Sequence, residues 1–89
     1  MEKRLKNKVK LIGNLYNIPT KEIINGKSAY KITLDTKGLV DCYLYSEEKE
    51  FSKCDIGTRI IIQGHLESSE GNPIVIIDLY RVIKLESGN

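Results

Sequence analysis

The chain has 89 residues, a length that suits one domain with a core that needs no disulfide or metal ion. Hydrophobic residues make up 40% and charged residues 29%, which is typical of a folded protein and unlike a disordered tail. The longest apolar runs, at residues 60–62 and 74–77, are far shorter than the roughly 20 residues that span a bilayer, so no membrane helix is expected.

The N-terminus and the cysteines indicate a reducing compartment. Residues 1–10 carry five basic residues with no apolar run after them, so they do not form a secretory signal. Cys42 and Cys54 are not a CxxC pair and have no histidine cluster beside them, so neither a zinc site nor a disulfide framework is predicted. We therefore expect a cytoplasmic protein with no metal and no other cofactor.

Charge is distributed unevenly, although the net charge is only +2. Residues 1–40 hold nine Lys or Arg against three Asp or Glu, a net charge of +6. Residues 41–89 hold five against nine, a net charge of −4. The first half is therefore a candidate anion-binding face.

Alternating apolar and polar residues predict three strands in the first half of the chain. The first strand covers residues 8–16. The second covers residues 29–35 and follows Asn25-Gly26, the strongest turn signal in the sequence. The third covers residues 39–45. In each strand one set of alternating side chains is apolar, and we expect that set to enter the core.

The second half predicts one short helix and a hairpin. Residues 46–51 begin with a serine that can cap a helix and continue with carboxylates, so we expect a short helix that presents Phe51 to the core. Residues 59–66 and 74–85 have strand patterns and are separated by the turn signal at residues 68–72. These two strands are expected to form a hairpin.

Five strands with one helix between the third and the fourth are the arrangement of the OB fold, a small Greek-key barrel. The sequence therefore predicts an all-β, five-stranded OB-fold barrel. A single domain is expected over residues 1–89. Within it, residues 1–6 form a basic N-terminal arm and residues 86–89 a short C-terminal end.

Four short segments, in order and at compatible spacing, carry a family pattern. Residues 7–15 read NKVKLIGNL, residues 25–29 NGKSA, residues 32–36 ITLDT and residues 56–66 IGTRIIIQGHL. They resemble the patterns N-K-V-x-L-x-G-N-L, N-G-x-x-A, I-T-L-A-T and K-G-S-x-V-x-I-x-G-x-L of bacterial single-stranded DNA-binding proteins. The resemblance extends over residues 4–85.

This resemblance implies an OB fold that binds single strands on one sheet face and self-associates through its first strand. Carried over by position, Arg4 and Lys8 match basic residues that contact the nucleic-acid backbone. Thr33 matches a residue of the binding face, and Tyr45 matches a base-stacking aromatic residue. A short version without the C-terminal tail of the family, as expected here, is similar to primosomal restart proteins or to copies carried by phages and mobile elements.

Binding of single strands without sequence preference needs cations for the phosphates and flat side chains on which bases stack. By strand parity, both kinds of side chain project from the same side of the predicted sheet. Tyr30, by contrast, shares the parity of Ile32 and is expected in the core. His65 has no second histidine near it and is expected to have a surface or pairing role. The predicted nucleic-acid-binding residues are Arg4, Lys8, Lys10, Lys31, Thr33, Tyr43 and Tyr45.

Two other interpretations stay open. In the first, the tyrosines are ordinary strand formers, the lysines only solvate the sheet, and the charged run at residues 3–10 is a solvated arm. In the second, the chain is an OB-fold protein-interaction module of a replication or primosome complex with weak nucleic-acid binding. The second is favoured by Asp41 and Glu47, at positions that are usually basic in the family, and by Leu39 in place of a stacking tryptophan.

The expected function is sequence-independent binding of single-stranded DNA, or of RNA by the same chemistry, in replication, recombination or repair. A homodimer or homotetramer is expected, which holds the strand open for a helicase, polymerase or recombinase, with no role for a membrane. The sequence has no GxxxxGK[ST], GxSxG or HExxH motif, so no enzyme activity is expected.

Overall fold

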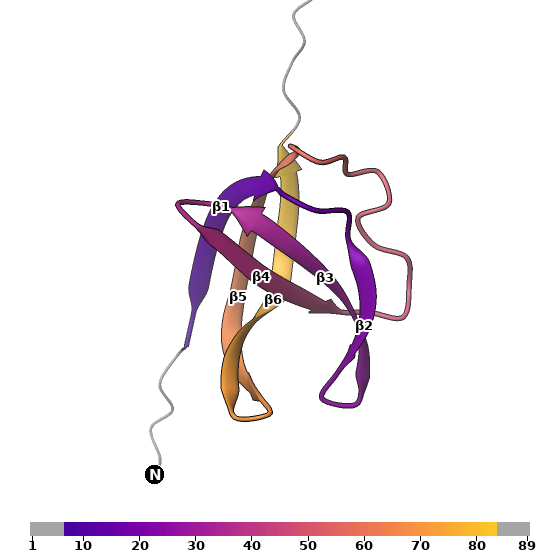
Figure 1. Cartoon of the computed structure of the whole chain (residues 1–89), viewed down its shortest axis with the longest axis vertical. Helices are drawn as coiled ribbons and strands as arrows, with labels where there is room; N and C mark the ends of the chain where they lie inside the picture. Colours follow the sequence, from indigo (N-terminus) through magenta and orange to yellow (C-terminus); the bar gives the residue numbers. More distant parts are fainter. Residues whose placement is uncertain (1–6, 84–89) are drawn as a thin grey trace, which may run out of the picture.

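The computed structural model describes residues 7–83, which form six strands of one sheet (Figure 1). The strands are β1 (Val9–Leu15), β2 (Thr20–Ile24), β3 (Lys27–Asp35), β4 (Leu39–Tyr45), β5 (Arg59–Ser69) and β6 (Asn72–Ile83). Among the described residues there is no helix, so none that could cross a membrane, and the all-β prediction is confirmed. Arg4, the predicted N-terminal arm and the predicted C-terminal end lie outside the described residues.

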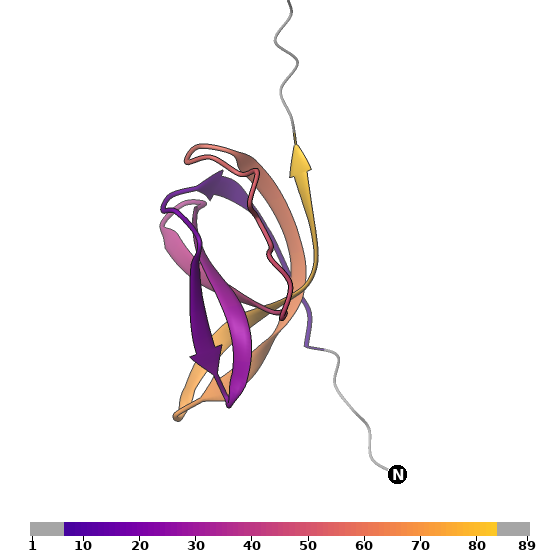
Figure 2. The same cartoon turned by 90° about the vertical axis from the view of Figure 1, so that its right-hand side faces the viewer.

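The strand pairings close into a ring. The order across the sheet is β1-β5-β6-β4-β3-β2, and β1 also pairs with β3 at Asn14–Asp35 and Leu15–Leu34. Five strands are thereby linked in a ring, and β2 extends it along the outer edge of β3. The β4–β6 pairing is parallel and the others are antiparallel. Figure 2 shows the strands curving around the interior.

The core fills the inside of this ring with alternate side chains from the strands. Ile32, Cys42 and Ile62 are fully buried, and Tyr30 and Leu44 pack against them from partly buried positions. Full burial of one aliphatic side chain of this size stabilises a fold by about 1.5–3 kcal/mol. The inward faces predicted for the second and third strands are therefore confirmed. The buried core cluster consists of Leu15, Ile32, Leu34, Cys42, Phe51, Ile60, Ile62 and Ile77.

The structure adds a strand that the sequence did not predict. β2 pairs with β3 along its whole length through the predicted turn, where Asn25 and Gly26 have φ of 51° and 78°. Positive φ at both positions is the geometry of the type I′ turn that joins tight hairpins. None of the side chains of β2 is buried, and Ile23 is 69% exposed. Backbone hydrogen bonds to β3, and not burial of side chains, therefore keep β2 in the sheet. A strand of this kind shows no alternation of apolar and polar residues in the sequence.

The short helix predicted at residues 46–51 is wrong, although two of its details are present. Ser46 Oγ accepts a hydrogen bond from the Glu48 N–H at 3.0 Å, as a helix cap would. Phe51, however, has φ of 59°, a left-handed conformation that a right-handed helix cannot contain. Its ring is buried and packs at 4.4 Å from the ring of Tyr80. A turn at residues 46–51 therefore places Phe51 in the core. A helix does not form instead, because so short a segment gains little from helix formation.

The β5–β6 hairpin is the longest element and contains a bulge. Gln63 pairs with Leu79 but Gly64 pairs with Ile77, so Asp78 is an extra residue on β6. The bulge changes which side chains face inward and allows both Ile77 and its neighbour Ile76 to be buried. A side chain at Gly64 would collide with the backbone carbonyl of Ile76, so the close approach requires glycine.

Candidate nucleic-acid interface

The outward side of β3 and β4 carries four of the seven predicted site residues. Lys31 lies opposite Tyr43, and Thr33 lies opposite Asp41. Tyr45 follows Tyr43 on the same side of β4. Directly opposed residues of antiparallel strands project from the same side of a sheet, so these side chains share one surface. We call this surface the β3–β4 face and define it by Lys31, Thr33, Asp41, Tyr43 and Tyr45.

Asp41 organises one end of the β3–β4 face. Its carboxylate accepts a 2.6 Å hydrogen bond from the Thr33 hydroxyl and lies 3.8 Å from Lys31 Nζ. Thr33 is only 5% exposed and offers a ligand little surface, so its role is to hold Asp41. Ion pairs at partly exposed positions contribute up to about 1 kcal/mol, so a phosphate can compete with Asp41 for Lys31.

Tyr43 is a half-buried neutral ring between charged neighbours. Burial raises the pKa of Tyr43, and Asp41 adds to this effect while Lys31 opposes it. The phenol therefore stays protonated at neutral pH. A neutral flat ring next to a cation is the combination that a nucleotide needs, one group for the base and one for the phosphate.

Tyr45 is held from both ends of its side chain. Lys27 Nζ lies 4.8 Å from the centre of the Tyr45 ring, a cation–π contact. The Tyr45 hydroxyl donates to Glu67 Oε1 at 2.9 Å and accepts from Asn25 Nδ2 at 3.2 Å. Burial, and then the hydrogen bond to Glu67, raise the pKa of Tyr45 against the opposing effect of Asn25. The ring is thus fixed in place before any ligand binds.

Lys27 was not among the predicted residues, but the sequence carried a signal for it. It follows the Asn25-Gly26 turn directly and shares the strand parity of Lys31. Extending the predicted second strand back to the turn would have added Lys27 to the cations on this side of the sheet.

A hydrogen-bond network joins the β2–β3 hairpin to the β5–β6 hairpin, whose tips lie side by side in Figures 1 and 2. Asn25 Nδ2 donates to the Ser68 carbonyl at 3.1 Å as well as to Tyr45. His65 Nε2 lies 2.8 Å from Glu67 Oε2, and His65 Nδ1 lies 2.9 Å from Asp78 Oδ2. We call this network the hairpin clasp; its side chains are those of Asn25, Tyr45, His65, Glu67 and Asp78.

His65 is the charge centre of the hairpin clasp. Only a doubly protonated imidazole can donate to both carboxylates at once. The hydrogen bonds to Asp78 and then to Glu67 raise the pKa of His65, and the bond from His65 lowers the pKa of Glu67. A protonated His65 therefore offsets the negative charges of Asp78 and of Glu67, the carboxylate that accepts the hydrogen bond of Tyr45.

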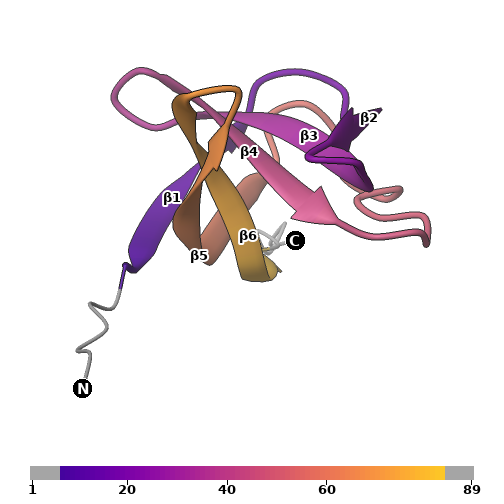
Figure 3. The same ribbon diagram turned by 90° about the horizontal axis from the view of Figure 1, so that it is seen from below.

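Lys8 and Lys10 lie on another part of the outward surface. Lys10 pairs with Gln63 of β5, and in the order of the sheet β5 and β6 separate β1 from β4 (Figure 3). The structure therefore does not bring these two lysines next to Tyr43 and Tyr45. A nucleic-acid strand that contacted both groups would have to cross β5 and β6.

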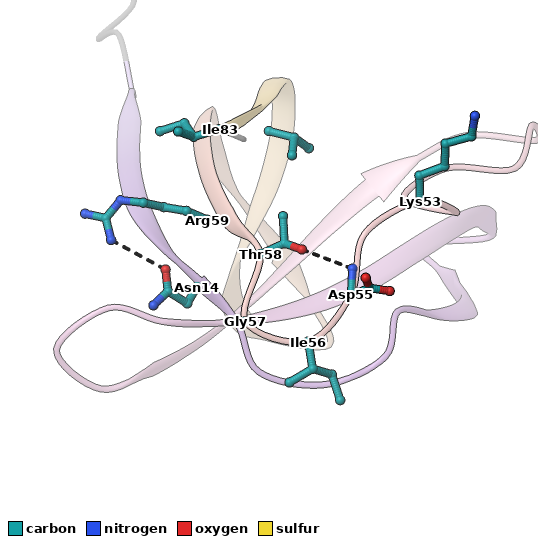
Figure 4. A pocket seen from close by; sticks show the side chains of 9 residues that line it. Asn14, Lys53, Asp55, Ile56, Gly57, Thr58, Arg59 and Ile83 are labelled. Carbon is teal, nitrogen blue, oxygen red and sulfur yellow. Dashed lines mark hydrogen bonds between the residues drawn. The ribbon is translucent and has the colours of Figure 1, made fainter. Parts of the chain in front are cut away.

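A cleft of about 780 Å³ is lined by none of the predicted site residues that the structure describes (Figure 4). It is bordered by the loop before β5 and by the ends of β1 and β6. Inside it the Asp55 N–H donates to Thr58 Oγ1 at 3.0 Å, and an Arg59 Nη donates to Asn14 Oδ1 at 3.5 Å. The candidate interface is thus an open sheet surface and not this cleft.

Within residues 7–83 there is no group of three or more His, Cys, Asp or Glu side chains that could hold a metal ion. Burial, with a smaller contribution from Asp41, raises the pKa of Cys42 to about 12, so its thiol stays protonated at neutral pH.

Comparison of the sequence with protein-family models and with curated proteins finds no significant match. Solved structures that are similar in fold include a PriB domain and an SSB protein. The dimeric N-terminal domain of PriB from Thermoanaerobacter tencongensis gives a TM-score of 0.69 at 20% identity, over 89% of this chain and 98% of that one. Plasmodium falciparum SSB in complex with ssDNA gives a TM-score of 0.66 at 18% identity, over 97% of this chain and 100% of that one. The likeness shows that the fold is the one these proteins share, the predicted OB fold.

Proposed function

We propose that this chain binds single-stranded DNA without sequence preference and acts in replication, recombination or repair. The observation that carries the proposal is the β3–β4 face, where Tyr43 and Tyr45 lie beside Lys31 and Lys27. The fold supports it, because in OB folds the corresponding strands and their flanking loops bind oligonucleotides. In this proposal the five-strand ring is the Greek-key barrel of that fold.

The mechanism combines stacking with phosphate neutralisation. Bases stack on the rings of Tyr43 and Tyr45, a contact that contributes about 1–3 kcal/mol per base and accepts every base. Lys27 binds one phosphate. Lys31 leaves its ion pair with Asp41 and binds a second phosphate. Arg4, Lys8 and Lys10 then continue the phosphate track beyond β6 and β5.

Self-association is proposed through β1. Within the described residues, Val9 to Gly13 pair with β5 on one side, and the pairing of β1 with β3 on the other side begins only at Asn14. This leaves a stretch of strand edge that a second copy can extend as an antiparallel pair around a two-fold axis. The similar PriB domain is a dimer. A dimer or tetramer would lengthen the track for the strand.

The proposed role is binding without catalysis. In the cytoplasm the protein would keep the strand open and present it to a helicase, polymerase or recombinase. Its contribution would be the exclusion of duplex formation, since a base stacked on a tyrosine is out of the double helix.

The carboxylates of the β3–β4 face favour a second candidate function. Asp41 pairs with Lys31, and Glu67 accepts the hydroxyl proton of Tyr45. In this alternative the same surface docks a replication or primosome protein, and binding of nucleic acid is weak.

A titration of fluorescently labelled poly-dT at several salt concentrations tests the proposal and separates the two candidates. Binding through phosphates must weaken steeply as salt rises, whereas a protein-docking surface has no such requirement. We expect tight binding of poly-dT, a steep salt slope and much weaker competition by duplex. Equal affinity for duplex, or weak binding with a flat slope, would contradict single-strand binding. Light scattering on the same samples tests the dimer, and a monomer mass throughout would remove the β1 interface.

A further inference from the structure

A second outward surface, on β1, β5 and β6, exposes aliphatic side chains that have no role in the proposed function. Ile12 lies opposite Ile61, which lies opposite Arg81 on the next strand. Arg59 lies opposite Ile83 in the same way. Together with Leu79, one step along β6 from Arg81 on the same side, these residues form one surface. We call it the β1–β5–β6 face; its residues are Ile12, Arg59, Ile61, Leu79, Arg81 and Ile83.

The β1–β5–β6 face exposes aliphatic side chains. Leu79 is 64% exposed and Ile12 is 45% exposed, and Ile61 and Ile83 lie partly exposed between them and the arginines. The surface is hollowed, because a depression of about 420 Å³ reaches from Lys10 to Leu79 and Arg81. Contiguous apolar surface of this kind, bordered by polar groups, marks an interaction site.

The charges of the β1–β5–β6 face have no internal partner. Within residues 7–83 neither Arg59 nor Arg81 forms an ion pair, and the contact of Arg59 is the 3.5 Å hydrogen bond to Asn14. None of the six residues of the face is acidic. Asp78, on its border, is already held by His65 at 2.9 Å. The face therefore presents two unpaired guanidinium groups next to exposed aliphatic side chains.

From this arrangement we propose that the β1–β5–β6 face docks a protein segment that presents carboxylates beside aliphatic side chains. Guanidinium groups bind carboxylates through two parallel hydrogen bonds, and the aliphatic side chains supply the apolar contact. This proposal concerns a different surface from the β3–β4 face and does not rest on DNA binding.

Neither a second copy of the chain nor a nucleic acid would use both the arginines and the aliphatic side chains of this face. In a symmetric contact both copies would present the same six residues, none of which is acidic, so Arg59 and Arg81 would find no carboxylate in the opposite copy of the face. A nucleic-acid strand that crossed β5 and β6 to reach Lys10 would contact the cations but would leave the aliphatic side chains uncovered, because Tyr80 turns its ring inward onto Phe51 and offers no surface for stacking.

Fluorescence anisotropy with the full-length protein and a fluorescein-labelled peptide of alternating Asp and Leu tests the proposal. The comparison probe is the same peptide with Lys in place of Asp. We expect the Asp–Leu peptide to bind and the Lys–Leu peptide not to bind. Arg81→Glu and Leu79→Ser should each weaken binding of the Asp–Leu peptide by about tenfold, a loss typical of one well-placed interface residue.

Matched controls change similar side chains elsewhere on the surface. Lys37→Glu reverses a charge on the exposed turn between β3 and β4, and Ile18→Ser removes a side chain that is 70% exposed. Both should leave peptide binding within about twofold, since neither touches the face. All four positions are exposed, so the variants should keep the circular dichroism spectrum of the unmodified protein.

Several results would overturn the proposal. Failure of the Asp–Leu peptide to bind, equal binding of the Lys–Leu peptide, or equal losses in the control variants would each show that the face does not recognise acidic and aliphatic groups together. A lower oligomer mass in Arg81→Glu, measured by sedimentation, would identify the face as a contact between copies. Loss of poly-dT binding in that variant, with the peptide unaffected, would identify it as a nucleic-acid contact.

Discussion

The two outward faces of this one sheet differ in how their charges are balanced. On the β3–β4 face, Lys31 is paired with Asp41, and the neighbouring hairpin clasp holds His65 between Glu67 and Asp78. On the β1–β5–β6 face, Arg59 and Arg81 have no acidic partner within residues 7–83. Balanced charges keep side chains in position and can be exchanged for those of a ligand. Unbalanced cations beside aliphatic groups instead require a partner that brings the opposite charge.

The largest effect is expected at Gly64, in the bulged hairpin of β5 and β6 that connects the two regions. A Gly64→Val substitution would place a side chain against the Ile76 carbonyl and force the bulged hairpin apart. We expect the free energy of unfolding to fall by about 3 kcal/mol or more, measured by urea denaturation. Gly26→Ala, at a turn with open space around it, should cost only about 1 kcal/mol through its positive φ. Equal losses for the two variants would mean that the close approach at Gly64 is not a constraint.

On the β3–β4 face, Tyr45→Ala should weaken binding of poly-dT by about 1–3 kcal/mol at every salt concentration, because it removes a stacking surface and no charge. Titrations at two salt concentrations measure both the loss and the slope. Tyr45→Phe keeps the ring, loses the bonds to Glu67 and Asn25, and should retain most of the affinity. Tyr30→Phe controls for the core, since it should change stability more than binding. If Tyr45→Ala bound like the unmodified protein while Tyr30→Phe did not, the assignment of the binding surface would be inverted.

The hairpin clasp predicts a pH dependence with a definite sign. The carboxylates raise the pKa of His65 in the folded protein above its ordinary value of 6.5, so its stabilising effect is complete below pH 6.5. The effect is lost as the pH rises through the folded-state pKa. Because the site is exposed and screened by solvent, we expect at most about 1 kcal/mol, measured by urea denaturation on both sides of the transition.

His65→Gln is the matched variant for this titration. It should remove the pH dependence above pH 6.5, and because His65 is the one histidine of the chain, its own titration can be followed by NMR. A histidine pKa at or below 6.5 would show that the clasp does not hold a protonated ring.

The smallest expected effect concerns the salt dependence of binding. Lys31→Gln should reduce the slope of log K against log salt by about 0.7, the value for one phosphate contact with a single strand. Lys10→Gln should do the same if the phosphate track crosses β5 and β6. An unchanged slope for Lys10→Gln, with the reduced slope for Lys31→Gln, would confine the track to the β3–β4 side of the sheet.

The sequence predicted the parts of the fold whose side chains alternate between core and solvent. β4 has the predicted bounds because Val40, Cys42 and Leu44 face inward while the residues between them do not. β2 was missed because none of its side chains is buried, so no apolar alternation marks it. The helix prediction failed because local capping at Ser46 is outweighed by the tertiary packing of Phe51.

The candidate site could be predicted in part for the same reason. Parity along two adjacent strands was enough to place Lys31, Tyr43 and Tyr45 together. It could not show the bond of Tyr45 to Glu67 or that of Asn25 to Ser68, because these join two hairpins that lie far apart in the sequence. Nor could it show that Lys8 and Lys10 lie two strands away, since that depends on the order of strands in the closed sheet.

The parallel pairing of β4 with β6 has a consequence for how the chain folds. The strands β2, β3 and β4 form one set of local hairpins, and β5 with β6 forms another. Cys42 with Val75 and Tyr43 with Ile76 join the two sets, across the whole intervening segment. Local hairpins form in microseconds, whereas contacts between distant segments must first overcome the entropy of loop closure. Docking of these parts, through β4 with β6 and through β1 with β5, is therefore the step expected to limit the folding rate.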